Sequence, residues 1–150
     1  MLSQTSGYAI RALSHLARMK GGTLYVREIS ESLHIPNAFL AKIFNTLAKK
    51  QLVATQRGIR GGVSLLKAPE SITLYEICEA LDEPILKSRC ILGLSECSDE
   101  MGCPVHHFWA KQLEREIRFL HKTTLADIAE PERLKVQNKE GKESGGNTTV

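Results

Sequence analysis

The sequence predicts a mainly α-helical fold with one small β-hairpin and a long helix near its C-terminal end. Apolar residues recur at helical spacing in three consecutive segments before residue 50. Two short apolar runs then flank a glycine-rich turn at residues 57–62, as expected of a β-hairpin. A single apolar stripe follows from Pro104 to His121. With 150 residues and 42% hydrophobic residues, the chain can build one compact core with an added element.

The first two helices are expected at residues 5–20 and 26–33. In the first, Tyr8, Leu13 and Leu16 belong to one apolar stripe, which two glycines end at positions 21 and 22. After the second, the His-Ile-Pro-Asn stretch predicts a turn, because proline favours the first turn of the helix that follows it.

A third helix is expected from Pro36 to about Lys50, with one buried and one exposed face. The buried face has the i, i+3, i+4, i+7 pattern and comprises Leu40, Ile43, Phe44 and Leu47. The opposite face is small, polar and basic and comprises Ala38, Lys42, Asn45 and Lys49. Such a face can enter the DNA major groove, where asparagine bonds base edges and lysine reaches bases or phosphates. An ordinary amphipathic surface helix would show the same pattern.

The predicted hairpin joins strands at residues 52–56 and 63–66 and carries Arg57 and Arg60 at its tip. From Asn37 to Lys67 there are six basic residues and no acidic one, which is typical of a nucleic-acid-binding surface or of a solvated basic face. The order of short helix, turn, basic helix and basic hairpin predicts a winged helix-turn-helix that binds DNA. The alternative is a hairpin that only closes the core.

The rest of the chain predicts a dimer and a disordered tail. A helix at residues 73–81 turns Cys78 inward, as a small core residue rather than a ligand. The long helix carries one apolar stripe, which we expect to pack against a second copy. We therefore expect a winged helix-turn-helix domain at residues 1–81 and a cysteine-rich loop at residues 82–103. A dimerisation helix with a C-terminal helical turn would follow at residues 104–130, and a disordered tail at residues 131–150.

Cys90, Cys97 and Cys103 are the sharpest chemical signal, because they lie within 14 residues of one another. Their spacing lacks the close Cys and His pairs of zinc ribbons and fingers. A thiolate-rich loop of irregular spacing is compatible with an iron-sulfur cluster. A zinc site, a thiol redox switch and a chance grouping remain open on these residues alone.

Three cysteines need a further ligand to complete a cluster. His106 follows Cys103 by three residues, so both would project from the same face of a helix, and it is the first candidate. His34, in the predicted turn, is a distant second. His107 would be rotated away, as a surface or interface residue.

Composition argues against several other classes of protein. The apolar stretches are short and broken by charge, and no signal-peptide pattern opens the chain, so we expect a cytoplasmic protein without a membrane segment. That compartment keeps thiols reduced, which disfavours a disulfide framework. We find no nucleophile-base arrangement, phosphate loop or carboxylate pair, and therefore expect no enzyme.

Four motifs together resemble the Rrf2 family of bacterial winged-helix transcription regulators, which includes IscR-like and NsrR-like iron-sulfur sensors. They are the opening segment at residues 5–13, the Arg-Gly-x-x-Gly-Gly turn at 57–62, the three-cysteine loop and the segment at 124–128. The resemblance runs from about Ser3 to Asp127, which is most of the chain. NsrR-like members have an acidic residue just before the tyrosine of the first helix, whereas this chain has Gly7, which counts against that mode.

The resemblance implies a homodimer with crossed long helices and a cluster between the cysteine loop and the partner subunit. A [2Fe-2S] cluster is favoured and a [4Fe-4S] cluster is the alternative, with Cys90, Cys97, Cys103 and His106 as the matching ligands. The resemblance also implies major-groove contacts by the third helix and minor-groove entry by the wing, at Ala38, Phe39, Ala41, Lys42 and Arg57.

The sequence thus predicts a homodimeric transcriptional regulator whose binding to double-stranded operator DNA is controlled by an iron-sulfur cluster. The cluster would sense redox state, nitric oxide or iron-sulfur status. One alternative is a winged-helix regulator with a direct thiol switch or a zinc site. Another is an adaptor of the same fold that binds a protein partner instead of DNA.

Overall fold

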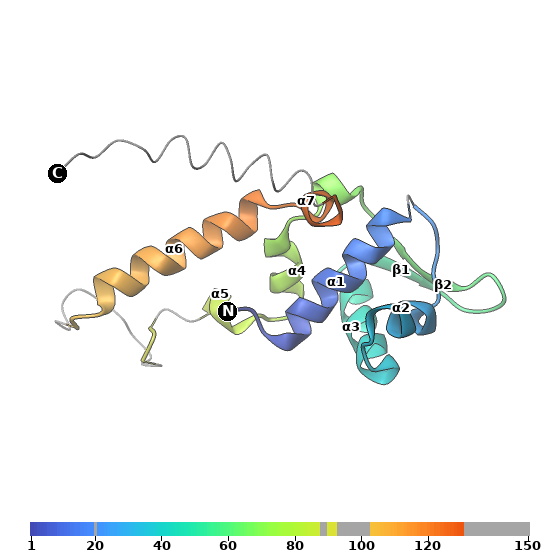
Figure 1. The fold of residues 1–150 in the computed structure, drawn as a ribbon, viewed down its shortest axis with the longest axis horizontal. Helices are drawn as coiled ribbons and strands as arrows, with labels where there is room; N and C mark the ends of the chain where they lie inside the picture. The colour runs from blue at the N-terminus through green and yellow to red at the C-terminus, as the bar shows by residue number, and fades with distance from the viewer. Residues whose placement is uncertain (20, 88–89, 93–102, 131–150) are drawn as a thin grey trace.

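The computed structural model describes residues 1–19, 21–87, 90–92 and 103–130 and has the expected fold class: helices with one antiparallel β-hairpin (Figure 1). Helices α1 to α3 precede the hairpin and four more follow it. In chain order the elements are α1 (Gln4–Arg18), α2 (Val26–Leu33), α3 (Asn37–Lys49), β1 (Val53–Gln56), β2 (Gly62–Leu65), the 3-10 helix η1 (Pro69–Ser71), α4 (Leu74–Ala80), α5 (Pro84–Lys87), α6 (His106–Lys122) and α7 (Leu125–Ala129).

Helix α1 lies at the centre of the fold and packs against α2, α3, α4 and α7. Its small and aliphatic residues Ala9, Leu13 and Leu16 are buried, as the apolar stripe predicts. The Ser3 hydroxyl caps the helix by accepting a hydrogen bond from the Ser6 backbone N–H at 3.2 Å. One core therefore joins the N-terminal helices to the C-terminal helix α7.

The turn between α2 and α3 is held by its own hydrogen bonds. His34 takes a left-handed conformation at the end of α2, with φ 54°. The Ser30 hydroxyl donates to the Ile35 carbonyl at 2.6 Å, and the Ile35 N–H donates back to the Ser30 carbonyl at 3.0 Å. Helix α3 then buries its predicted apolar face, Leu40, Ile43, Phe44 and Leu47. Its orientation relative to α2 is thus fixed by a short, bonded turn.

Strands β1 and β2 pair from Val53 with Leu65 to Gln56 with Gly62. A third short segment joins them, because Leu24 and Val63 exchange backbone hydrogen bonds of 2.7 and 3.1 Å. Gly62 lies beside this bridge with φ +134°, and an added Cβ would stand 2.5 Å from the Leu24 carbonyl oxygen. The hairpin therefore packs closely on the segment that precedes α2.

We expect Gly62→Ala to destabilise the protein by about 1–3 kcal/mol, because its backbone conformation and the nearby carbonyl both exclude a Cβ. Urea unfolding monitored by circular dichroism measures the change. Gly7→Ala is the matched control: Gly7 lies inside α1 and a Cβ there meets nothing within 4 Å. The control should be neutral or slightly stabilising, and an equal loss in both variants would contradict the expectation.

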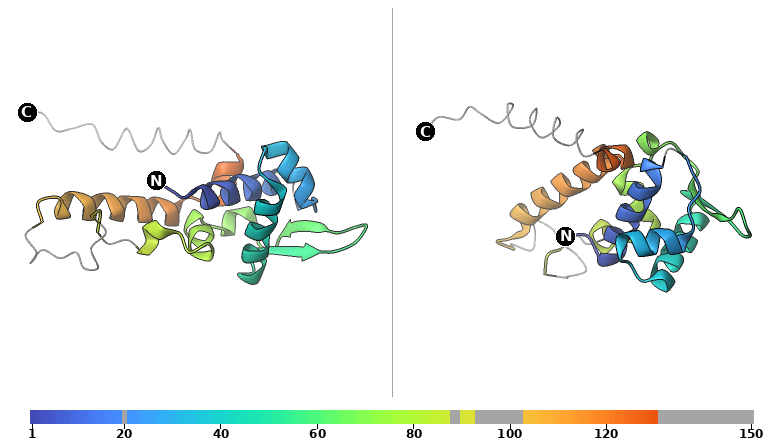
Figure 2. Two further views of the ribbon diagram at one scale, coloured as in Figure 1. Left: turned by 90° about the horizontal axis from the view of Figure 1, so that it is seen from below. Right: turned by 45° about the vertical axis from the view of Figure 1, so that its right-hand side comes forward.

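Helix α6 and the hairpin protrude from opposite ends of the molecule (Figures 1 and 2). Leu120 is the buried residue of α6, and the chain then returns to the core through α7. A bridge between Thr73 and Thr124 and a 2.7 Å hydrogen bond from the Leu125 N–H to the Ile72 carbonyl hold α7 in place. In the described ranges, no helix combines the length and apolar character that crossing a membrane requires.

Two short elements were not expected from the sequence. Helix α5 lies within the predicted cysteine-rich loop at residues 82–103, and η1 follows the hairpin. The predicted tail at residues 131–150 lies outside the described residues, as do most residues of the cysteine loop.

Candidate DNA interface and cysteine segment

The exposed face of α3 is the one that the sequence predicts for DNA. Ala38, Lys42, Asn45 and Lys49 are all exposed along it, while Ala41 is half-buried. Phe39 is 36% exposed, and its ring packs edge-on against Tyr8 of α1 with centroids 5.8 Å apart. The Phe39 ring therefore contributes to the packing of α3 on α1, besides the DNA contact that the family resemblance implies.

A groove joins this helix face to the wing, that is, the hairpin formed by β1, β2 and their turn. It runs between the start of α2, the middle of α3 and the hairpin, and Asn45 and Arg57 both line it. Its other polar or aromatic lining residues are Tyr25, Arg27, Asn37, Phe44, Thr55 and Gln56. Three of the predicted DNA residues, Ala41, Asn45 and Arg57, thus line one concave surface.

Sequence reasoning missed the contribution of α2 and the strand to this groove. Arg27 is the second residue of α2, where its guanidinium pairs with Glu31 at 2.8 Å yet remains largely exposed. Asn37 begins α3, and Gln56 ends β1. A signal was available, since all three are polar residues at the ends of elements that adjoin the predicted DNA-reading helix.

The electrostatics of this surface favour a polyanion. Lys42, Lys49, Arg57 and Arg60 form no ion pair within the described part of the chain. Lys67, by contrast, pairs with Glu76 at 2.9 Å and lies away from the groove. The four unpaired cations are therefore available to phosphate groups.

The structure describes only part of the predicted cysteine site. Cys90 is buried, and Cys103 and His106 are half-buried. The His106 backbone N–H donates to the Cys103 carbonyl at 3.1 Å, which places these two residues one turn apart at the start of α6. Cys97 lies outside the described residues. In the described ranges, no three His, Cys, Asp or Glu side chains are grouped to hold a metal ion.

Cys78 is a core residue, as the sequence predicts. It is fully buried on the inner side of α4. Burial, and then the nearby negative charge of Glu83, raise the pKa of its thiol to about 11. Cys78 is therefore a buried, neutral thiol at physiological pH.

Glu83 is a buried carboxylate that the sequence did not single out. It is 2% exposed and accepts hydrogen bonds from the Ser3 backbone N–H at 3.0 Å and the Ser3 hydroxyl at 2.6 Å. The Ser6 hydroxyl also donates to it. Burial raises the pKa of the Glu83 carboxyl, but the Ser3 and Ser6 hydrogen bonds outweigh this effect and hold the pKa below its ordinary value. Glu83 thus ties the start of α1 to the chain just before Cys90.

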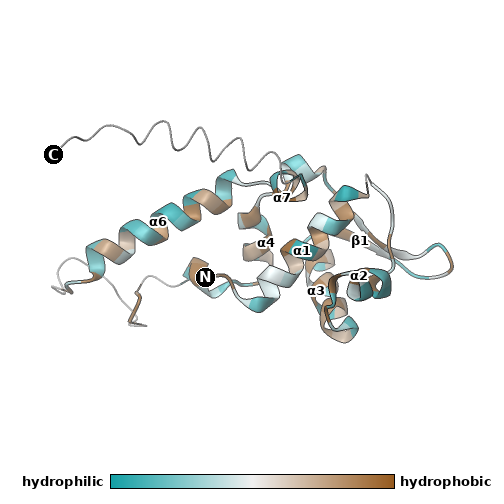
Figure 3. Ribbon diagram, in the orientation of Figure 1, coloured by the Kyte–Doolittle hydropathy of each residue, from teal (hydrophilic) through white to brown (hydrophobic). Residues whose placement is uncertain are grey.

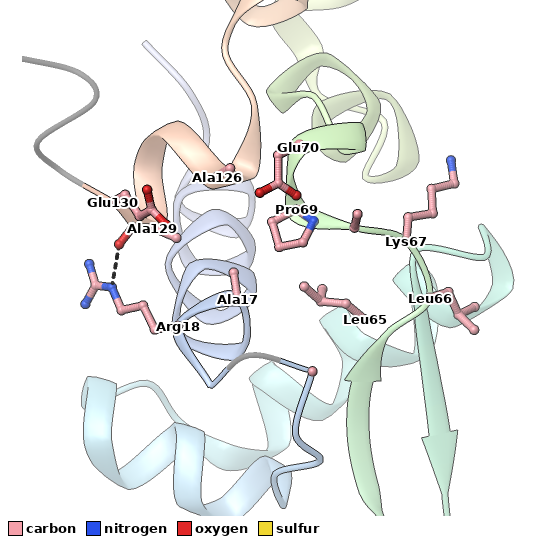
Figure 4. A pocket seen from close by; sticks show the side chains of 12 residues that line it. Ala17, Arg18, Leu65, Leu66, Lys67, Pro69, Glu70, Ala126, Ala129 and Glu130 are labelled. Carbon is pink, nitrogen blue, oxygen red and sulfur yellow. Dashed lines mark hydrogen bonds between the residues drawn. The ribbon is translucent and has the colours of Figure 1, made fainter. Parts of the chain in front are cut away.

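A separate cavity of about 600 Å³ lies between the end of α1, the base of β2, η1 and α7 (Figure 4). Arg18 borders it and donates from Nε to the Ala129 carbonyl at 3.1 Å. Much of the remaining lining is apolar, including Ala17, Leu65 and Ala126. None of the predicted DNA or cluster residues lines this cavity, so it is not part of either candidate site.

Helix α6 exposes apolar side chains on two faces. One face forms a groove lined by Ala110, Leu113 and Ile117, with His106 and His121 at its ends. The opposite face carries Phe108 and Phe119, which are 64% and 52% exposed. Apolar and polar segments alternate along the helix (Figure 3). Exposed apolar area of this kind on a projecting helix marks an interaction surface.

The known proteins that this chain resembles are transcriptional regulators. The Rrf2 family model, described as an iron-dependent transcriptional regulator, matches residues 2–131. A predicted HTH-type transcriptional regulator of Aquifex aeolicus is 36% identical over 131 residues, covering 85% of this chain and 90% of that protein. The HTH-type transcriptional regulator IscR of Sodalis glossinidius is 31% identical over 134 residues, covering 89% and 81%.

The fold is also that of a solved regulator. CymR, described as the global cysteine regulator of B. subtilis, superposes with a TM-score of 0.71 and 24% identity, covering 86% of this chain and 95% of that one. The family match spans both the groove-forming elements and α6. The chain therefore belongs to the Rrf2 family of helix-turn-helix transcriptional regulators, which are DNA-binding proteins rather than enzymes.

Proposed function

We propose that this regulator is a homodimer that binds operator DNA through α3 and the wing, under the control of an iron-sulfur cluster. The observation that carries the DNA contact is the groove that Asn45 and Arg57 both line, on a surface whose four predicted cations form no ion pair among the described residues. Residues Ala38, Phe39, Ala41, Lys42, Asn45 and Lys49 of α3 would enter the major groove, and Arg57 and Arg60 the adjacent minor groove.

The dimer would form through α6. Its groove of Ala110, Leu113 and Ile117 offers an apolar surface that a second copy of the helix could cover. Two winged domains would then read two half-sites about one helical turn, or ~34 Å, apart on the DNA. Sedimentation equilibrium tests the dimer, and a purely monomeric protein at micromolar concentration would contradict it.

The cluster would be held by Cys90, Cys97, Cys103 and His106, as either a [2Fe-2S] or a [4Fe-4S] centre. Thiol and imidazole groups are suitable donors, Cys90 is shielded from water, and Cys103 and His106 are one turn apart. When bound, the cluster would supply redox chemistry and reactivity toward oxygen or nitric oxide. A coupling of about 1–3 kcal/mol between this segment and the DNA interface would change operator affinity about 5- to 150-fold.

The thiols themselves are the second candidate sensor. The half-buried Cys103 favours it, because a thiol that is partly accessible to solvent can react with an oxidant. Iron and sulfide analysis with an ultraviolet-visible spectrum of anaerobically isolated protein distinguishes the two. Colourless protein without iron after reconstitution would reject the cluster and leave a direct thiol switch or a zinc site, which metal analysis separates.

Arg57→Ala is expected to weaken operator binding roughly tenfold, about 1.4 kcal/mol, because it removes a cation from the wing side of the groove. The slope of log affinity against log salt should become less negative by about 0.9 if one phosphate contact is lost. Fluorescence anisotropy over a salt series measures both. Lys87→Ala, in α5 and outside the groove, is the control. An unchanged affinity and slope in Arg57→Ala would exclude a wing contact.

A further inference from the structure

We infer that Tyr25 is a positioning residue for DNA binding that holds the tip of the wing in place. Its hydroxyl donates to the Ile59 carbonyl at 2.5 Å and lies 3.3 Å from the Gly58 carbonyl. Both carbonyls belong to the turn that joins β1 to β2, between Arg57 and Arg60. Tyr25 therefore links the start of α2 directly to the part of the wing that carries the two arginines.

The residue type at this position supports a role outside helix capping. Tyr25 is the N-cap of α2, where its backbone N–H donates to the Glu28 carboxylate at 2.7 Å while its hydroxyl bonds to the wing turn. Serine, threonine, aspartate and asparagine are preferred at N-caps because their short side chains accept from the first turn. A tyrosine forgoes that stabilisation. In this chain its length instead lets the hydroxyl reach the wing.

The hydrogen bond from the Tyr25 hydroxyl is a second attachment of the hairpin to the chain around the start of α2. Near the turn, at the second residue of β2, Val63 already exchanges two backbone hydrogen bonds with Leu24. The ladder of β1 and β2 ends at Gln56 and Gly62, so the turn beyond it has no strand partner. Two-stranded hairpins are marginally stable by themselves. The Tyr25 hydroxyl therefore holds the turn where the ladder no longer does.

This anchoring would favour DNA binding by ordering the wing in advance. Tyr25 and Arg57 line the same groove, with Asn45 on its other side. A wing that is free to swing would have to be ordered when DNA binds, and that entropy would be lost from the binding free energy. This step rests on the proposed contact between Arg57 and DNA.

Tyr25→Phe removes only the hydroxyl and should weaken operator binding roughly three- to tenfold, the range expected for one hydrogen bond. In an Arg57→Ala background the same change should cost roughly twofold or less, because the two residues act through one element. Tyr75→Phe is the matched control, since Tyr75 lies on α4, where its ring stacks on His121. Its affinity should equal that of the wild type.

Two further measurements separate positioning from general stability. Tyr25→Ser restores a preferred N-cap residue, so the melting temperature should hold or rise while operator affinity falls. Without DNA present, trypsin should cleave after Arg57 or Arg60 several-fold faster in Tyr25→Phe than in wild type. If Arg57→Ala alone leaves binding intact, the proposed wing contact fails. If Arg57→Ala weakens binding but Tyr25→Phe changes neither affinity nor cleavage, the role of Tyr25 is rejected.

Discussion

Replacing Cys103 with serine is expected to abolish iron and sulfide binding and the visible absorbance of anaerobically reconstituted protein. A serine hydroxyl is a poor ligand for the soft iron-sulfur centre that thiolates favour. The difference in operator affinity between reconstituted and metal-free wild type, expected to be about 5- to 150-fold, should disappear in this variant. Iron and sulfide counts, spectra and anisotropy titrations measure the three effects.

Cys78→Ala is the matched control for that experiment. Cys78 is fully buried on α4, with a thiol pKa raised to about 11, and is not one of the proposed ligands, so its loss should leave the cluster in place. A variant at Cys103 that still binds iron with wild-type stoichiometry would contradict its assignment as a ligand. If wild type itself stays colourless, peroxide treatment followed by dithiothreitol tests the thiol switch by a reversible change in affinity.

Replacing Glu83 with alanine is expected to lower the free energy of unfolding by about 3–5 kcal/mol. The change leaves the Ser3 N–H and the hydroxyls of Ser3 and Ser6 without their buried acceptor. Hydrogen bonds to a charged group contribute about 1.5–3 kcal/mol each, and they are not fully additive here because they share one carboxylate. Glu83→Gln should lose less, since an amide oxygen can still accept from Ser3. Urea unfolding gives the values, and Glu79→Ala, exposed on α4, is the control.

The lowered pKa of Glu83 also predicts how the free energy of unfolding changes with pH. Its pKa in the folded protein lies below the ordinary value of 4.5, so the folded state binds this proton less readily than the unfolded state. Its stabilisation is therefore complete above about pH 4.5 and is lost as the pH falls through the folded-state pKa. Below pH 4.5 the stability of wild type should fall more steeply than that of Glu83→Gln. Parallel curves for the two proteins would show that this carboxyl does not contribute.

Much of the fold could be predicted because its signals are local. The residues of α2 agree with the predicted range, and the apolar stripe of α3 is buried as its spacing requires. The glycines of the turn placed the hairpin to within one residue. Helix α5 has only four residues, which is too short to show helical periodicity. Local pattern therefore gave the longer helices and the hairpin, and it missed the two shortest helices, α5 and η1.

The unpredicted parts of the sites depend on contacts between distant residues. Glu83 and Ser3 are 80 positions apart, and no spacing rule connects an isolated glutamate to a helix N-terminus. Tyr25 reaches a carbonyl 34 residues away, from a position where its residue type is unfavourable for capping. The groove beside α3 could not be predicted from local pattern, because it forms only where α2, α3 and the hairpin come together in the folded protein. The convergence of the three loop cysteines remains a prediction, because Cys97 lies outside the described residues.

The bond between Ser3 and Glu83 sets an order of events during synthesis. The first turn of α1 leaves the ribosome early, but its acceptor is made 80 residues later. A nascent chain that has reached only the wing would therefore lack this acceptor at the start of α1, and a shortened protein ending at Leu81 would lack it permanently. This anchor of the central helix α1 thus forms only after the DNA-reading elements have been made.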